Sequence, residues 1–121
     1  MRARLLAALA GGLLLAGSAS SQSRACPSDG ALLASWYGNK SGARTASGER
    51  FSSDGLSAAH PTLPFGTHLR VTNPRTLRSV VVRVNDRGPA RWTCRSLDLS
   101  RGAARAIGLP GVGSVLIERL D

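Results

Sequence analysis

The sequence predicts a mainly-β domain, a small closed barrel of short strands with one short helix. Two segments carry the strand signal. Apolar and polar residues alternate over 68–72, and a β-branched run covers 79–85. Turn residues at Asn73-Pro74 and Gly88-Pro89 end these segments. Only 101–107 has the composition of a helix. Because an open sheet this small would leave its edges exposed, we expect the strands to close.

Residues 1–20 are expected to be a signal peptide. Arg2 and Arg4 precede an apolar run, 5–16, that is too short to span a bilayer, and small residues follow it. We therefore expect an exported protein, periplasmic or extracellular, with no stable membrane insertion after cleavage. Residues 21–31 are expected to be a flexible segment and 32–121 a single domain, acting as a monomer.

The two cysteines, Cys26 and Cys94, are expected to form a disulfide in an oxidising compartment. We do not expect a lipid anchor at Cys26, because polar residues separate it from the apolar run. Two cysteines and two separated histidines predict no metal site, and no cofactor is expected.

The formal net charge is +9, and nearly all of it comes from arginine. Such a surface favours anionic partners: nucleic acid, anionic lipid or a cell-wall polymer. We do not expect nucleic acid, because the chain is exported, poor in aromatic residues and has scattered arginines. A basic surface that simply faces solvent stays an equal alternative.

The first strand is expected over 31–37. Trp36 and Tyr37 then point to opposite faces, so that one lies in the core and the other could stack on a sugar ring. A loop rich in Gly, Ser and Thr follows over 39–48, as is typical of a cleft wall. Glu49, next to Arg50, is at its simplest half of an exposed charge pair.

Residues 56–67 are expected to be a stiff extended connector, because Pro61 and Pro64 restrict the residues before them. This connector fixes His60, which is either a structural histidine or a proton-transfer and hydrogen-bonding group. Asp86 lies where the valine-rich strand meets a loop. It either bonds the backbone of its own turn or serves acid–base chemistry in a cleft.

A short strand is expected over 96–99, followed by a helix with Ser100 as N-cap and Gly108 just past its end. The last strand is expected over 114–120.

Five segments in this order resemble the domain of the rare lipoprotein A family, over about 32–120 of the chain: residues 34–38, 45–51, 58–67, 84–89 and 97–100. The resemblance implies a six-stranded double-psi β-barrel. It also implies a peptidoglycan lytic transglycosylase, which cleaves the β-1,4 bond between MurNAc and GlcNAc in peptide-poor glycan strands and leaves 1,6-anhydro-MurNAc ends. The functional Glu, His and Asp of the family match Glu49, His60 and Asp86.

This reaction needs a carboxylic acid to protonate the leaving oxygen, while the substrate's own C6 hydroxyl is the nucleophile. We expect Asp86 to be the acid and then the base, with Glu49 assisting and His60 orienting a carboxylate or binding sugar. Arg83 or Arg87 beside Asp86 would make it a poorer acid.

We expect substrate contacts from Trp36, Tyr37, Asn85 and Arg87. The alternatives are a non-catalytic, expansin-like wall-binding module and a basic secreted interaction protein that uses the barrel as a scaffold.

Overall fold

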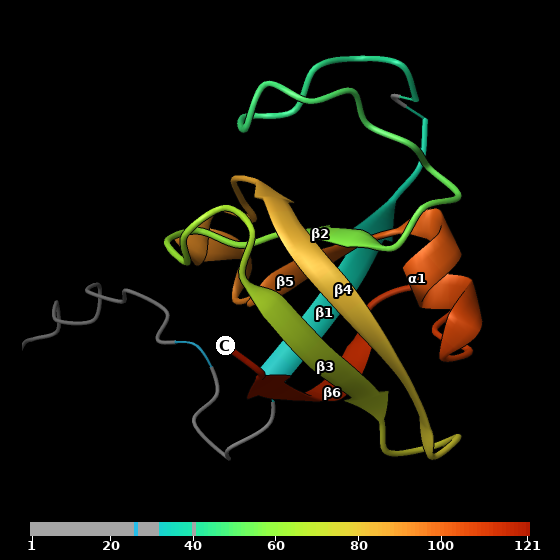
Figure 1. The fold of residues 1–121 in the computed structure, drawn as a ribbon. Helices are drawn as coiled ribbons and strands as arrows, with labels where there is room; N and C mark the ends of the chain where they lie inside the picture. Colours follow the sequence, from blue (N-terminus) through green and yellow to red (C-terminus); the bar gives the residue numbers. More distant parts are fainter. Residues whose placement is uncertain (1–25, 27–31, 40) are drawn as a thin grey trace, which may run out of the picture.

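The computed structural model describes residues 26, 32–39 and 41–121, and these form a closed six-stranded barrel (Figure 1). The expected mainly-β barrel with one short helix is confirmed. Around the barrel the strands follow the order β1-β5-β2-β4-β3-β6. The expected signal peptide and nearly all of the expected segment 21–31 lie outside the described residues. The elements are β1 (Leu32–Tyr37), β2 (Ser57–Ala59), β3 (His68–Asn73), β4 (Arg78–Asp86), the 3-10 turn η2 (Arg91–Thr93), β5 (Leu97–Ser100), α1 (Arg101–Ala106) and β6 (Gly113–Arg119).

The core lies inside the barrel and follows the alternation in the sequence. On β3, Leu69 and Val71 are almost fully buried, and on β4 the same is true of Val82 and Val84. Arg70, Val81 and Arg83, which alternate with them, are exposed, as the period of two requires, whereas Asn85 near the end of β4 is buried. The remaining core comes mainly from β5, β6 and α1: Leu97, Leu99, Ala103, Ala104, Ile107, Leu109 and Val115.

The strand β2 is the element that the sequence did not single out. It lies within the expected extended connector, pairing parallel with β4 on one side and antiparallel with β5 on the other. Ala59 is opposite Asp86 in one pairing and opposite Asp98 in the other. This short strand therefore brings together two carboxylates from different parts of the chain.

The helix α1 begins and ends as expected. The Oγ atom of Ser100 accepts from Ala103 N at 3.3 Å, so Ser100 is the N-cap. Gly108 follows the helix with φ of +70°, a conformation that glycine adopts at little cost. Within the described part of the chain, no helix is both long and apolar enough to cross a membrane.

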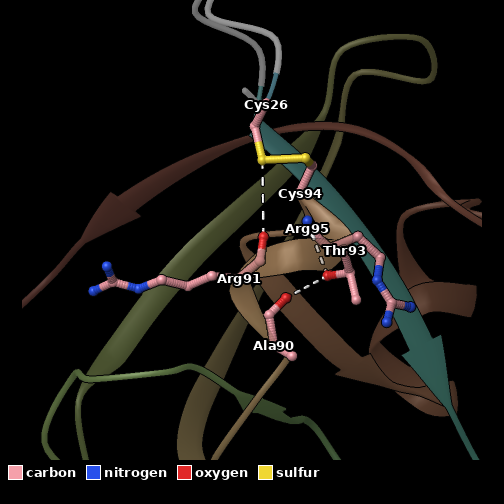
Figure 2. The surroundings of a disulfide bond; sticks show 6 residues. All are labelled: Cys26, Ala90, Arg91, Thr93, Cys94 and Arg95. Carbon is pink, nitrogen blue, oxygen red and sulfur yellow. Dashed lines mark hydrogen bonds between the residues drawn. A yellow bond between two sulfur atoms is a disulfide. The ribbon is translucent and has the colours of Figure 1, made fainter. Parts of the chain in front are cut away.

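A disulfide joins Cys26 to Cys94, with 5.2 Å between their Cα atoms, and confirms the expected pairing (Figure 2). Cys94 directly follows η2, so the bond ties residue 26 to that turn. The Sγ atom of Cys26 also lies 3.8 Å from Arg91 O. Because a disulfide sulfur carries no hydrogen, this is a contact and not a donated hydrogen bond.

Candidate active site

Asp86 ends β4, and its carboxylate is held by three donors. Oδ1 accepts from the backbone N–H groups of Ala46 and Arg87, at 2.9 Å each. Oδ2 accepts from the hydroxyl of Tyr37 at 3.1 Å. Asp86 is partly exposed. A strand end, a loop that comes 40 residues earlier in the chain and a tyrosine from β1 thus fix one accessible carboxyl group.

Asp86 lines a cavity of about 220 Å³ together with Tyr37, Ala59, Arg87 and Asp98. The register explains the second acid, because Ala59 of β2 pairs with both aspartates. Directly paired residues on neighbouring strands share a face of the sheet, and neighbouring strands lie about 4.8 Å apart. The backbones of Asp86 and Asp98 therefore lie about 10 Å apart, with both carboxyl groups at one cavity.

Asp98 is a site residue that the sequence analysis missed. Its Oδ1 accepts from the hydroxyl of Ser35 and lies 3.7 Å from Arg95 Nη1. Arg95 Nη1 also donates to Ser35 Oγ at 2.7 Å, so the three side chains form one network. The one signal in the sequence is that Asp98 stands between two leucines, Leu97 and Leu99, both of which are buried in the strand. That signal does not show that Asp98 lies near Asp86, because this depends on which strands become neighbours.

Tyr37 and Trp36 point to different surroundings, as the strand period predicts. The ring of Tyr37 stacks on Phe51 with 4.6 Å between ring centroids. Burial raises the pKa of Tyr37 well above 10, and the nearby charge and hydrogen bond of Asp86 raise it further. Tyr37 therefore stays protonated and donates to Asp86. Trp36 is 38% exposed, and its Nε1 donates to Pro110 O at 3.1 Å.

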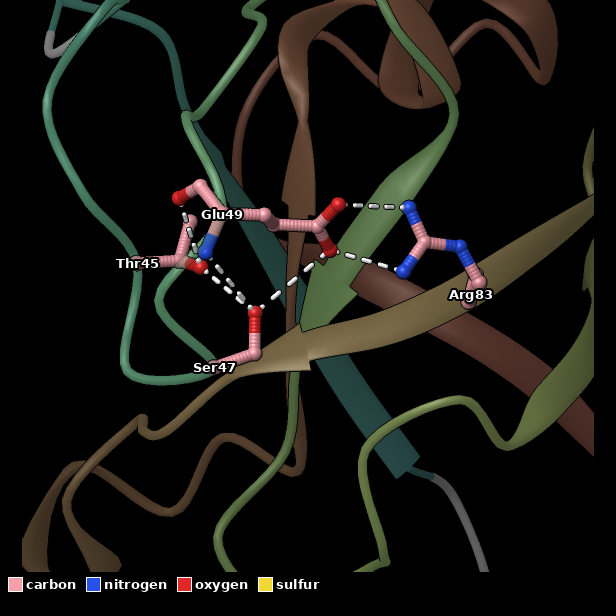
Figure 3. Close-up of polar contacts among 4 residues, drawn as sticks. All are labelled: Thr45, Ser47, Glu49 and Arg83. Carbon is pink, nitrogen blue, oxygen red and sulfur yellow. Dashed lines mark hydrogen bonds and ion pairs between the residues drawn. The ribbon is translucent and has the colours of Figure 1, made fainter.

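Glu49 forms an ion pair with Arg83 of β4 (Figure 3). The two guanidinium nitrogens Nη1 and Nη2 of Arg83 donate to Oε1 and Oε2 at 2.7 and 3.0 Å. These bonds are the largest cause of a pKa for Glu49 below its usual 4.5; Asn85 and Ser47 also lower it, while slight burial opposes them. At neutral pH Glu49 is thus an ionised carboxylate, which accepts protons poorly and has none to donate.

Asn85, an expected substrate contact, is only 3% exposed. Its backbone carbonyl accepts from Ser47 N at 3.2 Å, which helps to hold the loop that carries Glu49. The expected contact between Asn85 and substrate stays a prediction.

His60 is attached to the site through its backbone, since its N–H donates to Asp86 O at 3.2 Å. Its ring Nδ1 accepts from Thr62 N and Leu63 N at 3.1 and 3.0 Å, so the neutral ring carries its proton on Nε2. Burial, followed by the charge of Arg87, holds the pKa of His60 below 6.5. His60 lines a different cavity, of about 420 Å³, which among the described residues shares no lining residue with that of Asp86.

The side chains of the two arginines near Asp86 in sequence, Arg83 and Arg87, contact other residues. Arg83 binds Glu49, whereas the guanidinium of Arg87 lies 3.9 Å from the ring centroid of Phe65 and donates to His60 O and Leu63 O. Within the described residues neither forms an ion pair with Asp86. Neither arginine therefore supplies the ion pair to Asp86 that the sequence analysis considered.

Of the expected site residues, the structure thus gathers Asp86, Tyr37 and Arg87 around one cavity and adds Asp98. Glu49 is linked to this cavity through its ion pair with Arg83, which lies on the same strand as Asp86. His60 is linked to it through the hydrogen bond from its backbone N–H to Asp86 O. Joint action of Glu49, His60 and Asp86 in one groove stays a prediction. Among the residues that the structure describes, no three or more His, Cys, Asp or Glu side chains gather as metal ligands would.

Comparison with known proteins agrees with the motifs. The sequence model of a family described as lytic transglycolase matches residues 29–118. A Synechocystis protein named probable endolytic peptidoglycan transglycosylase RlpA is 58% identical over 89 residues, which cover 71% of this chain and 27% of that protein. The endolytic peptidoglycan transglycosylase RlpA of Pseudomonas aeruginosa is 47% identical over 91 residues, covering 73% and 26%. That of Neisseria meningitidis is 44% identical over 90 residues, covering 72% and 37%.

The chain therefore spans only about a quarter to a little over a third of the length of these relatives. Among solved structures, the Streptomyces papain inhibitor matches with a TM-score of 0.56 at 22% identity, over 74% of this chain and 91% of that one. This likeness concerns the fold alone, and it confirms the expected double-psi β-barrel.

Proposed function

Because this chain belongs to the lytic transglycolase family, as its resemblance to rare lipoprotein A implied, we propose that it is a peptidoglycan lytic transglycosylase. It cleaves the β-1,4 bond between MurNAc and GlcNAc and leaves a 1,6-anhydro-MurNAc end. The observation that carries the proposal is the partly exposed carboxyl of Asp86, fixed at a strand end beside a cavity that also holds Asp98.

Asp86 is the general acid and then the general base. Its proton moves to the glycosidic oxygen as the bond from that oxygen to MurNAc C1 breaks, and GlcNAc leaves with a new hydroxyl. The MurNAc C6 oxygen then bonds to C1, and its proton returns to Asp86, so that no water is consumed. Tyr37 supports this cycle because it stays protonated and keeps the Asp86 carboxyl in one orientation.

Asp98 contributes negative charge near the reacting C1. The transition state resembles an oxocarbenium ion, and a fixed carboxylate stabilises the positive charge that develops there. Ser35 and Arg95 fix Asp98 in the structure.

Glu49 and His60 position the parts around Asp86. The ionised Glu49 holds the loop with Ala46, which donates to Asp86, against Arg83 of β4. His60, which lines a second cavity, offers its Nε2–H to the glycan. Trp36, exposed beside a cavity of about 470 Å³ that Tyr37 also lines, is a stacking surface for a further sugar.

The natural substrate is proposed to be peptide-poor glycan outside the cytoplasmic membrane, reached after export with residues 1–20 removed. The Cys26–Cys94 disulfide supports an oxidising compartment. It also supports the absence of a lipid on Cys26, because its sulfur is already bonded. We propose that residues 32–121 act as one domain and as a monomer.

The test is to incubate the purified protein with intact sacculi and with sacculi stripped of stem peptides by an amidase, and to identify new glycan ends by mass spectrometry. Anhydro ends, more abundant on stripped sacculi, are expected. Reducing MurNAc ends would identify a hydrolase instead. Sedimentation with sacculi without any new ends would contradict the proposal in favour of a binding module.

A further inference from the structure

The β3–β4 hairpin ends in a basic tip with an exposed leucine. The loop Pro74-Arg75-Thr76-Leu77 joins the two strands, and Asn73 Oδ1 accepts from Arg75 N at 2.9 Å. Thr76 Oγ1 donates to Ile107 O at 2.8 Å, which holds the tip against the end of α1. Figure 1 shows this hairpin reaching the lower right of the barrel, far from the loops above β2.

Three arginines belong to the segments that meet at this place, the hairpin and the last turn of α1. Arg75 lines a cavity of about 220 Å³ between the hairpin and the turn at Gly108. A Cβ atom on Gly108 would lie 3.8 Å from Arg78 Nη1, so Arg78 faces the same turn. Arg105 is in the last turn of α1, three residues before Gly108. Within the described residues no carboxylate pairs with any of the three.

Leu77 lies between these arginines in an unfavourable conformation. Its φ is +62°, which a residue with a Cβ rarely adopts, and its side chain is 82% exposed. Val112, from the turn on the other side of the cavity, is 61% exposed. The positive φ belongs to the hairpin loop, in which Leu77 N donates to Asn73 O at 2.8 Å. The feature that indicates a partner is the pair of exposed apolar side chains beside arginines that have no carboxylate partner among the described residues.

We propose that this tip, formed by Arg75, Leu77, Arg78, Arg105 and Val112, binds the surface of an anionic phospholipid membrane. The guanidinium groups bind headgroup phosphates, for which their forked donors are suited. Leu77 and Val112 enter the boundary between headgroups and acyl chains. A purely polar polyanion would leave the two apolar side chains without a partner, so the combination of residues favours a lipid surface.

This docking leaves the candidate active site away from the lipid. Arg78 and Asp86 are the two ends of β4, whose nine residues span about 26 Å at about 3.3 Å each. A protein resting on its hairpin tip therefore holds Asp86 well above the headgroups, where glycan has access. The inference does not depend on the proposed catalytic activity, and neither does its test.

The test measures binding of the exported, purified protein to vesicles of phosphatidylglycerol mixed with phosphatidylcholine, and to phosphatidylcholine alone. Each arginine close to an anionic surface strengthens binding about 5-fold, so Arg75→Gln with Arg78→Gln should weaken it about 25-fold. Leu77→Asn should weaken it about tenfold while relieving the backbone, since asparagine tolerates positive φ.

The matched control is Arg91→Gln with Arg119→Gln, which removes the same charge at other exposed sites. This double variant should retain most of the binding. Equal losses in the two double variants, or none in either, would overturn the proposal. If Leu77→Asn bound these vesicles as well as the wild type, the tip would be a polyanion site and the assignment to lipid would be wrong. Thermal melts of every variant are the control for correct folding.

Discussion

Replacing Glu49 with Gln should reduce activity only moderately, because we propose that Glu49 is a positioning group and not the acid. The amide keeps the size of the carboxylate and can still accept a bond from Arg83, but it has no charge. The ion pair joins side chains that are 37% and 44% exposed, with bonds of 2.7 and 3.0 Å. Exposed pairs contribute up to about 1 kcal/mol, and the two-pronged geometry puts this pair near that limit.

A loss of about 1 kcal/mol in positioning the loop corresponds to about a 5-fold loss in kcat/KM. Loss of a general acid would be about 10²- to 10⁴-fold. Arg83→Gln should show the same small effect as Glu49→Gln, and the double variant should be no worse than either alone, because both changes remove one interaction. The assay is the initial rate of release of anhydro ends from stripped glycan.

The pair also makes stability depend on pH. The folded-state pKa of Glu49 is below its usual 4.5, so the stabilisation is complete above that value and is lost as pH falls through the lower, folded-state pKa. The melting temperatures of wild type and Glu49→Gln should therefore converge in acid. A 100-fold loss of activity in Glu49→Gln with Arg83→Gln near wild type would refute this reasoning and assign the chemistry to Glu49.

Three further predictions concern other parts of the chain. Replacing Cys26 and Cys94 with Ser should lower the free energy of unfolding by about 2–4 kcal/mol, measured by denaturant titration, because the unfolded chain without the disulfide has more conformational freedom. The His60 ring should titrate below pH 6.5 by NMR, and since its folded-state pKa is depressed by burial and Arg87, stability should decline as pH falls through this window. Leu77→Asn should raise the free energy of unfolding by about 1 kcal/mol and the melting temperature by about 4–8 °C, because it relieves a positive φ.

The barrel was predictable where one side of a strand is buried. Leu69 and Val71, and Val82 and Val84, are all in the core, and the residues between the members of each pair, Arg70 and Arg83, face solvent. The strand β2 gave no such signal, since Ser57–Ala59 has three small residues that are all buried between two neighbouring strands. Its pairing comes from tertiary structure, which local pattern does not encode.

The candidate site was predictable to the same extent. Asp86 was identifiable because a valine-rich strand ends there in a turn, and Tyr37 because an aromatic pair ends the first strand. Asp98 was not identifiable as a site residue. It lies near Asp86 only because both aspartates pair with Ala59, one on each side of β2. The partner of Glu49 was not predictable either, as Arg83 lies 34 residues away and the direction of its side chain is set by the barrel.

The role that we propose for Asp86 is to move the proton in a reaction that leaves anhydro ends. Its most direct test is the yield of 1,6-anhydro-MurNAc ends from stripped glycan by wild type and by Asp86→Asn, with unfolding and sacculus binding measured on the same samples. Asn can accept the bonds from Ala46, Arg87 and Tyr37, but it cannot donate and recover a proton. A fall of about 10²-fold or more with fold and binding unchanged is predicted. An equal yield of anhydro ends from the two proteins would show that Asp86 is not the group that moves the proton.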